Sequence, residues 1–181
     1  MKERMNVSVR TLMICAMICA IALPLLITTA QGLAQGKAPQ AQAQAPPAPT
    51  DKAAYFSYSD SQVAWKDLEA RQVINHRAME GGTFSFNIRI VKDDSPPLVH
   101  AKSVDLWIVE TGTATAITGG ELLDKKKNAN AASDDVAGSS IRGGIEQPLK
   151  PGDALFVPPG VPHGFKDLKG FRAYLIRWDV K

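Results

Sequence analysis

The residues that could carry out chemistry include His163, which ends the stretch PGDALFVPPGVPHGF (residues 151–165) in a chain with only three histidines. Pro158 and Pro159 lack a backbone donor and end the apolar run before them. Gly160 permits the backbone angle of a tight turn. We therefore expect a histidine with little freedom at the start of a new strand, held as a metal ligand is held before the metal arrives. The alternative is a structural histidine that bonds a backbone carbonyl and fixes the turn.

A second group of candidates lies upstream, in LVHAKSVDLWIVETG (residues 98–112), which contains His100 and Asp105. If Asp105 points into a barrel, His100, Asp105 and His163 can meet near one mouth. Two imidazoles and one carboxylate form a facial triad that leaves coordination positions open and suits Fe(II), Mn(II) or Zn(II). The sequence therefore predicts a divalent metal site at these three residues. The alternative is that Asp105 accepts turn amides or pairs with Lys102.

Residues near these candidates are expected to line a small-molecule pocket: Lys102, Trp107 and Phe165. Trp107 shares the strand face of Asp105, because side chains alternate along a strand. In TFSFNIRIV (residues 83–91), two faces alternate in the same way, and the pattern leaves open whether the apolar side or the side with Asn87 and Arg89 fills the barrel.

The elements that must position these residues are mostly strands. Period-two alternation or short apolar runs predict strands at residues 83–91, 104–109, 113–118, 147–150, 154–157 and 171–178. Residues 110–112 are expected to be a turn, and residues 119–144 an irregular loop. SQVAWKDLEAR (residues 61–71) is the best helix candidate, with a serine start. Many short strands separated by Gly and Pro favour an all-β sandwich or barrel with a short N-terminal helix.

The stretch around His163 also resembles a known motif. Gly152, five residues, Pro158, one residue, Gly160, two residues and His163 match the second motif of the cupin superfamily. In that pattern an Asn usually follows four residues after the His, and here Asp167 stands there.

The upstream segment resembles the first cupin motif, which has two His one residue apart, then an acid, six residues and a Gly. Asp105 and Gly112 fit its acidic end. In one alignment His100 is the second His and Leu98 occupies the first position. In another, His100 is the first and Lys102 replaces the second. In both alignments one ligand His is missing.

The resemblance covers about residues 83–178 and implies a double-stranded β-helix (jelly roll, or cupin barrel) with a divalent metal. Dioxygenase, isomerase and lyase chemistry all occur among cupins, and cupins often pair through strand edges, so a homodimer fits the resemblance. The runs GTATAITGGELLD, IRGG and KPGDALFVPPGVPHGF resemble exported bacterial single-domain cupins.

The N-terminus indicates export. A basic opening, an uncharged apolar stretch at residues 11–29 and small residues before Ala34 form the pattern of a signal peptide at residues 1–34. We expect cleavage after Ala34, with Ala30 as the second choice and an uncleaved membrane anchor as the alternative. An Ala/Gln/Pro-rich linker at 35–50 and the barrel domain at 51–181 follow. The chain is thus expected to be periplasmic or secreted.

Composition narrows the function classes. The chain of 181 residues has a formal net charge of +3, and removing its first ten residues leaves 18 basic and 17 acidic side chains, a net charge of +1. No basic field remains for a nucleic-acid partner. Both cysteines, Cys15 and Cys19, lie in the expected signal peptide, so the exported domain has no disulfide and no thiol nucleophile.

Three functions fit these observations. The first is a metal-dependent enzyme, such as an oxygenase or isomerase, acting on a small organic substrate. The second is a non-catalytic module that binds or senses a small molecule. The third is a structural barrel without metal. No catalytic acid–base pair stands out from the spacing, so the sequence names no catalytic residue.

Overall fold

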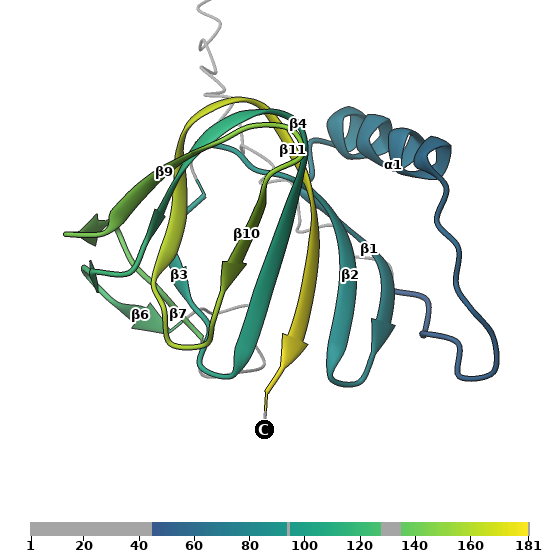
Figure 1. The fold of residues 1–181 in the computed structure, drawn as a ribbon, viewed down its shortest axis with the longest axis horizontal. Helices are drawn as coiled ribbons and strands as arrows, with labels where there is room; N and C mark the ends of the chain where they lie inside the picture. Colours follow the sequence, from purple (N-terminus) through teal and green to yellow (C-terminus); the bar gives the residue numbers. More distant parts are fainter. Residues whose placement is uncertain (1–44, 94, 128–134, 181) are drawn as a thin grey trace, which may run out of the picture. The chain divides into compact units, whose positions relative to one another are not determined.

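The computed structural model describes residues 45–93, 95–127 and 135–180. Antiparallel strands and one helix make up this part of the chain (Figure 1). Its elements follow in the order α1 (Tyr58–Arg71), β1 (Asn75–Gly81), β2 (Phe84–Ile90), β3 (Leu98–Val99), β4 (Ser103–Thr118), β5 (Glu121–Leu122), β6 (Lys126–Lys127), β7 (Val136–Ala137), β8 (Ile141–Arg142), β9 (Ile145–Leu149), β10 (Ala154–Val157) and β11 (His163–Asp179). The predicted all-β jelly-roll barrel with a short N-terminal helix is confirmed.

The barrel is built on a two-stranded ribbon that folds over on itself. β4 and β11 pair antiparallel from Ser103 opposite Asp179 to Thr118 opposite His163. Both strands curve over together at the top of Figure 1. One half of the ribbon is flanked by β2 and β10, and the other by β3 and β9. The two ends of the ribbon are thereby brought face to face across the barrel.

The bend of the ribbon lies at Gly112. The prediction of a turn at residues 110–112 between two strands is wrong, because β4 continues through these residues. Gly112 has φ +74°, and a Cβ there would lie 2.3 Å from the carbonyl oxygens of Lys169 and Gly170. Only glycine allows this backbone angle together with so close an approach. A glycine that signals a turn in the sequence therefore serves as the corner of one long strand.

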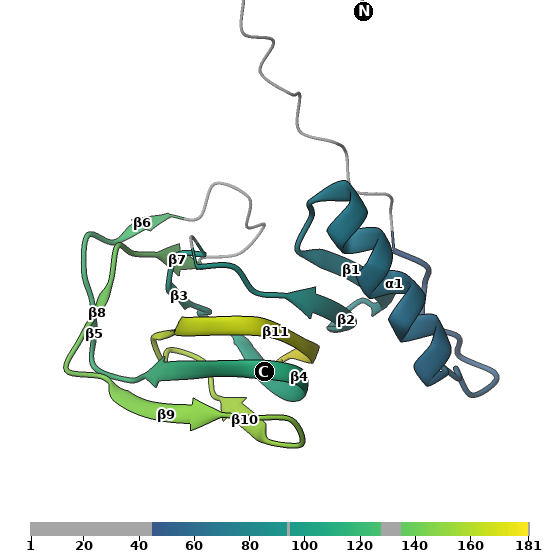
Figure 2. The same ribbon diagram turned by 90° about the horizontal axis from the view of Figure 1, so that it is seen from above.

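The main core fills the space between the two halves of the ribbon. Its buried side chains come from both halves and from their flanking strands: Val91, Trp107, Val109, Ala114, Ala116, Leu149, Leu155, Val157, Phe171, Ala173 and Leu175. A second cluster lies between α1 and the outside of the sheet, where Trp65 and Leu68 pack on Ile88. In Figure 2, α1 lies beside β1 and β2.

This second cluster decides which face of β2 lines the barrel. Phe86, Ile88 and Ile90 pack toward α1. Asn87 therefore faces inward, where it is buried and its amide donates to Leu175 O over 3.2 Å. Arg89 lines an interior cavity. The apolar side of the strand belongs to the helix contact and the polar side to the barrel interior.

Helix α1 begins three residues before the predicted start. Ser57, and not Ser61, is the N-cap, and its hydroxyl accepts from the backbone N–H of Asp60. The Asp60 carboxylate in turn accepts from the backbone N–H of Ser57, which completes a capping box. The indole of Trp65 donates to Arg89 O over 3.2 Å, so the helix also supports the strand that carries Arg89.

Several short strands were not predicted. β1 carries His76 and little apolar alternation, so its sequence resembles a loop. The segment predicted to be an irregular loop, residues 119–144, contains β5, β6, β7 and β8, each of two residues. Such short bridges depend on neighbouring strands, which a local pattern does not reveal.

The described residues contain no helix that is long and apolar enough to cross a membrane. The predicted signal peptide and most of the predicted linker lie outside the described residues.

Candidate metal centre

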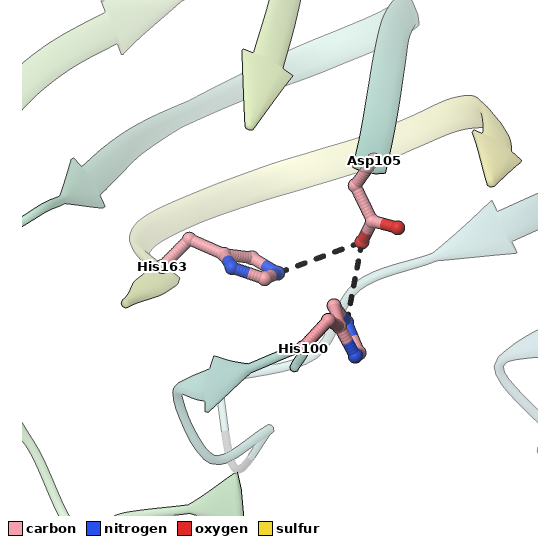
Figure 3. A group of neighbouring side chains, drawn as sticks. All are labelled: His100, Asp105 and His163. Atoms are coloured by element: carbon pink, nitrogen blue, oxygen red, sulfur yellow. Dashed lines mark ion pairs between the residues drawn. The ribbon is translucent and has the colours of Figure 1, made fainter. Parts of the chain in front are cut away.

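Three side chains meet inside the barrel: His100, Asp105 and His163 (Figure 3). Nε2 of His100 lies 3.4 Å from Oδ2 of Asp105, and Nε2 of His163 lies 3.5 Å from the same oxygen. All three residues are buried. One carboxylate oxygen thus faces two imidazole nitrogens in a site shielded from bulk water.

The folded ribbon explains how residues so distant in sequence meet. Asp105 lies near one end of β4, and His163 begins β11, where it pairs with Thr118 at the other end of β4. Folding at the bend places these two ends opposite each other. Gly160, with φ +76°, forms the turn before β11 and donates its backbone N–H to His100 O over 2.8 Å. The turn that holds His163 therefore also anchors His100.

Both imidazoles are oriented by a hydrogen bond at Nδ1. The Nδ1 atom of His100 lies 2.8 Å from Oδ2 of Asp135, and that of His163 lies 3.2 Å from Val161 O. Carboxylates and carbonyls only accept, so both Nδ1 atoms carry the hydrogen and donate. The Nε2 atoms, which face Asp105, are left as the atoms that can ligate. A carboxylate or a backbone carbonyl holding a histidine in this way is the usual outer support of a metal ligand.

Two of the separations within the cluster fit a divalent cation. Ligands at about 2.0–2.2 Å from a tetrahedral metal are roughly 3.4 Å apart, which matches the two separations at Asp105 Oδ2. Nε2 of His163 and Oδ2 of Asp105 are too far apart for an ordinary hydrogen bond. A cation between these two acceptors would satisfy both.

A guanidinium already contacts this cluster. Arg177 donates from Nε to Oδ1 of Asp105 over 2.6 Å and from Nη2 to Oδ2 over 2.8 Å. The same Nη2 lies 2.7 Å from Nε2 of His100 and donates to it. A metal bound by all three residues must therefore displace Nη2 from His100. Arg177 is the internal competitor for the metal site.

Arg177 also sets the charge state of Asp105. Burial, the largest single influence, would raise the pKa of this carboxyl, but the hydrogen bonds and charge of Arg177 act together with the two facing histidines and hold the pKa well below its usual range. Asp105 is therefore a carboxylate at any ordinary pH, as a metal ligand must be.

A cavity of about 50 Å³ adjoins the cluster. Its walls come from both halves of the barrel: Arg89, Val91, Ser95, Pro96, Leu98, Asp105, Trp107, His163, Gly164, Phe165 and Arg177. Two of the predicted pocket residues, Trp107 and Phe165, lie here with ring centroids 4.9 Å apart. Lys102 does not line this cavity. It is exposed and lies just before the first residue of β4.

The sequence reasoning missed Arg177 and Asp135. Arg177 could have been found, because Phe171, Ala173 and Leu175 are buried core residues and alternation continues their inward face to Arg177. No pattern in the sequence indicated Asp135. It lies within a long polar segment, and its proximity to His100 is visible only in the folded structure. For Arg89, the strand pattern left open whether the side chain faces the barrel interior or solvent.

The comparisons with known proteins concern the fold. No protein-family model and no curated protein matches the chain. Among solved structures, it is similar to a Bacillus halodurans protein with 11% identity and a TM-score of 0.46, over 73% of this chain and 86% of that one. KdgF from Halomonas sp. has 14% identity and a TM-score of 0.41, over 59% and 80%. A cupin-2 domain containing protein from Shewanella frigidimarina has 15% identity and a TM-score of 0.41, over 66% and 97%. These likenesses concern the fold alone, and the resemblance to the cupin superfamily rests on the two sequence motifs.

Proposed function

We propose that this chain is an exported cupin-type protein that binds one divalent transition metal at His100, Asp105 and His163, and a small molecule in the adjoining cavity. The observation that carries the proposal is the shared orientation of the two histidines. Each has its Nδ1 atom bound to an acceptor and its Nε2 atom directed at one oxygen of Asp105. Such a donor set suits Fe(II), Mn(II) or Zn(II).

The residues in and around the cluster have different roles. His100, Asp105 and His163 would hold the metal, which when bound supplies a Lewis acid able to polarise a ligand oxygen. Asp135 keeps His100 in the tautomer that ligates. Trp107 and Phe165 form an aromatic part of the cavity wall. Export rests on the N-terminal pattern, which would deliver the barrel to the periplasm or the medium.

The test is the metal content of the full chain, produced without an affinity tag and measured by elemental mass spectrometry. The parent protein should carry about one equivalent of a transition metal, and His163→Ala should lose it. His76→Ala is the matched control, because His76 is the third histidine and lies on β1, outside the cluster. A parent protein that takes up no metal after loading with Fe(II), Mn(II) and Zn(II) would refute the proposal.

A further inference from the structure

The cavity beside the metal cluster contains an imbalance of charge. Two arginines and one carboxylate line it. Arg177 pairs with Asp105, whereas Arg89 forms no ion pair among the described residues. Burial, followed by the nearby charge of Arg177, lowers the pKa of Arg89 to about 10, so Arg89 stays charged at neutral pH. Among the residues that line the cavity, positive charges therefore outnumber negative charges by one.

Two residues of the same cavity wall carry a buried hydrogen-bond donor without an acceptor. Nε of Arg89 and Nε1 of Trp107 are both buried and have no hydrogen-bond partner in the described part of the chain. The two residues are neighbours, since Cζ of Arg89 lies 5.8 Å from the ring centroid of Trp107. Buried donors are nearly always paired, so two orphaned donors in one cavity indicate a missing acceptor.

The remaining walls and the size of the cavity limit that acceptor. Val91, Leu98 and Phe165 give it an apolar side. A volume of about 50 Å³ has room for roughly three to five non-hydrogen atoms, at about 10–15 Å³ for each water-sized occupant. The occupant must therefore be small, carry a negative charge and tolerate an apolar neighbour.

We infer that this cavity binds a short-chain carboxylate, whose oxygens accept from Arg89 and Trp107 and whose carbon end faces the apolar wall. The inference rests on the proposed function for the small-molecule pocket but does not require the metal. A carboxylate supplies the missing counter-charge, and its planar pair of oxygens suits the guanidinium fork. A short-chain carboxylate would then be the class of ligand that the metal centre acts on or senses.

The test uses sodium acetate as the probe, with acetamide as its uncharged analogue of the same shape. Binding to the full-length protein is measured by isothermal titration calorimetry at constant ionic strength in sodium chloride, after removal of metal. Acetate should bind and acetamide should not, and benzoate should bind more weakly than acetate because it exceeds the cavity. Equal binding of acetate and acetamide, or displacement of acetate by equimolar chloride, would overturn the inference.

Variants separate the carboxylate pocket from the metal centre. Arg89→Met and Trp107→Phe should each weaken acetate binding, Arg89→Met by about tenfold or more, since it loses a charge-assisted hydrogen bond. Arg142→Met is the matched control on an exposed arginine paired with Glu121, and it should bind acetate as the parent does. If Arg89→Met does not fold, Arg89→Lys and Trp107→Phe carry the test.

The two proposals fail in different ways. His100→Ala should lose metal and keep acetate binding, because His100 belongs to the metal cluster but does not line the cavity, whereas Arg89→Met should weaken acetate binding and keep metal. A protein that binds acetate but no metal supports the carboxylate pocket and refutes the metal centre. A protein that binds metal but shows no acetate binding in either the metal-free or the loaded form refutes the carboxylate pocket alone.

Discussion

At the scale of single residues, the centre depends on which partners each of the two Asp105 carboxylate oxygens contacts. Oδ1 accepts from Arg177, while Oδ2 accepts from Arg177 and also faces both histidines. The proposed metal would therefore compete with this guanidinium for the same carboxylate. Because the guanidinium is part of the chain, it stabilises the buried carboxylate whenever metal is absent.

Replacing Arg177 should separate these two roles. Arg177→Met removes the competitor and should tighten metal binding by about tenfold or more, because metal no longer breaks a charge-assisted hydrogen bond. The metal-free variant should lose about 3 kcal/mol of unfolding free energy, since Asp105 is left buried without a partner. Metal titration and urea unfolding measure the two effects. Arg172→Met, on the same strand and bonded to Glu69, is the control; an unchanged metal affinity in Arg177→Met would contradict the competition.

The depressed pKa of Asp105 predicts a pH dependence for the metal-free protein. A carboxyl whose folded pKa lies below its unfolded value of about 4 contributes stability above that pH and loses it as the pH falls. The difference in unfolding free energy between the parent and Asp105→Asn should therefore be largest above about pH 5 and shrink below about pH 4. Urea unfolding at several pH values measures it, and a difference that does not change with pH would count against the Asp105–Arg177 pair.

At the scale of elements, the bend in the β4–β11 ribbon is what brings Asp105 and His163 together. Gly112→Ala tests it, because the new Cβ would overlap two backbone carbonyls and add the cost of a positive φ. We expect a loss of about 3 kcal/mol or more and weaker metal binding. Gly119→Ala is a matched control with φ +73° and open space around its Cβ, so it should cost only about 1 kcal/mol. Equal costs in thermal or urea unfolding would mean that the close approach at Gly112 is unimportant.

The elements also show which parts of the fold a sequence can predict. Local rules predicted the strand at residues 154–157 and the turn before His163, because Pro158 and Gly160 act through their own backbone. Local rules did not predict that β4 continues through Gly112, since a glycine looks the same in a turn and in a bend. They also did not show which face of β2 points into the barrel. The apolar face of this strand could pack either on α1 or in the barrel interior, and in the structure it packs on α1.

At the scale of the whole molecule, export remains a prediction, as does a homodimer. The signal-peptide pattern predicts a mature protein that begins at Gln35, measurable by intact mass spectrometry of periplasmic and secreted fractions. Ala34→Leu should block this cleavage and shift it to Ala30, because small residues are needed at the cleavage site. A full-length chain recovered in the membrane fraction would favour the anchor instead.

The proposed metal between His100, Asp105 and His163 can be located in a crystal structure of the protein grown with Mn(II) or Zn(II), using anomalous data at the metal edge. We expect one strong peak within bonding distance of both Nε2 atoms and of Asp105 Oδ2, with Arg177 Nη2 moved away from His100. A barrel without that peak, in which Arg177 still donates to His100 and Asp105, would contradict it.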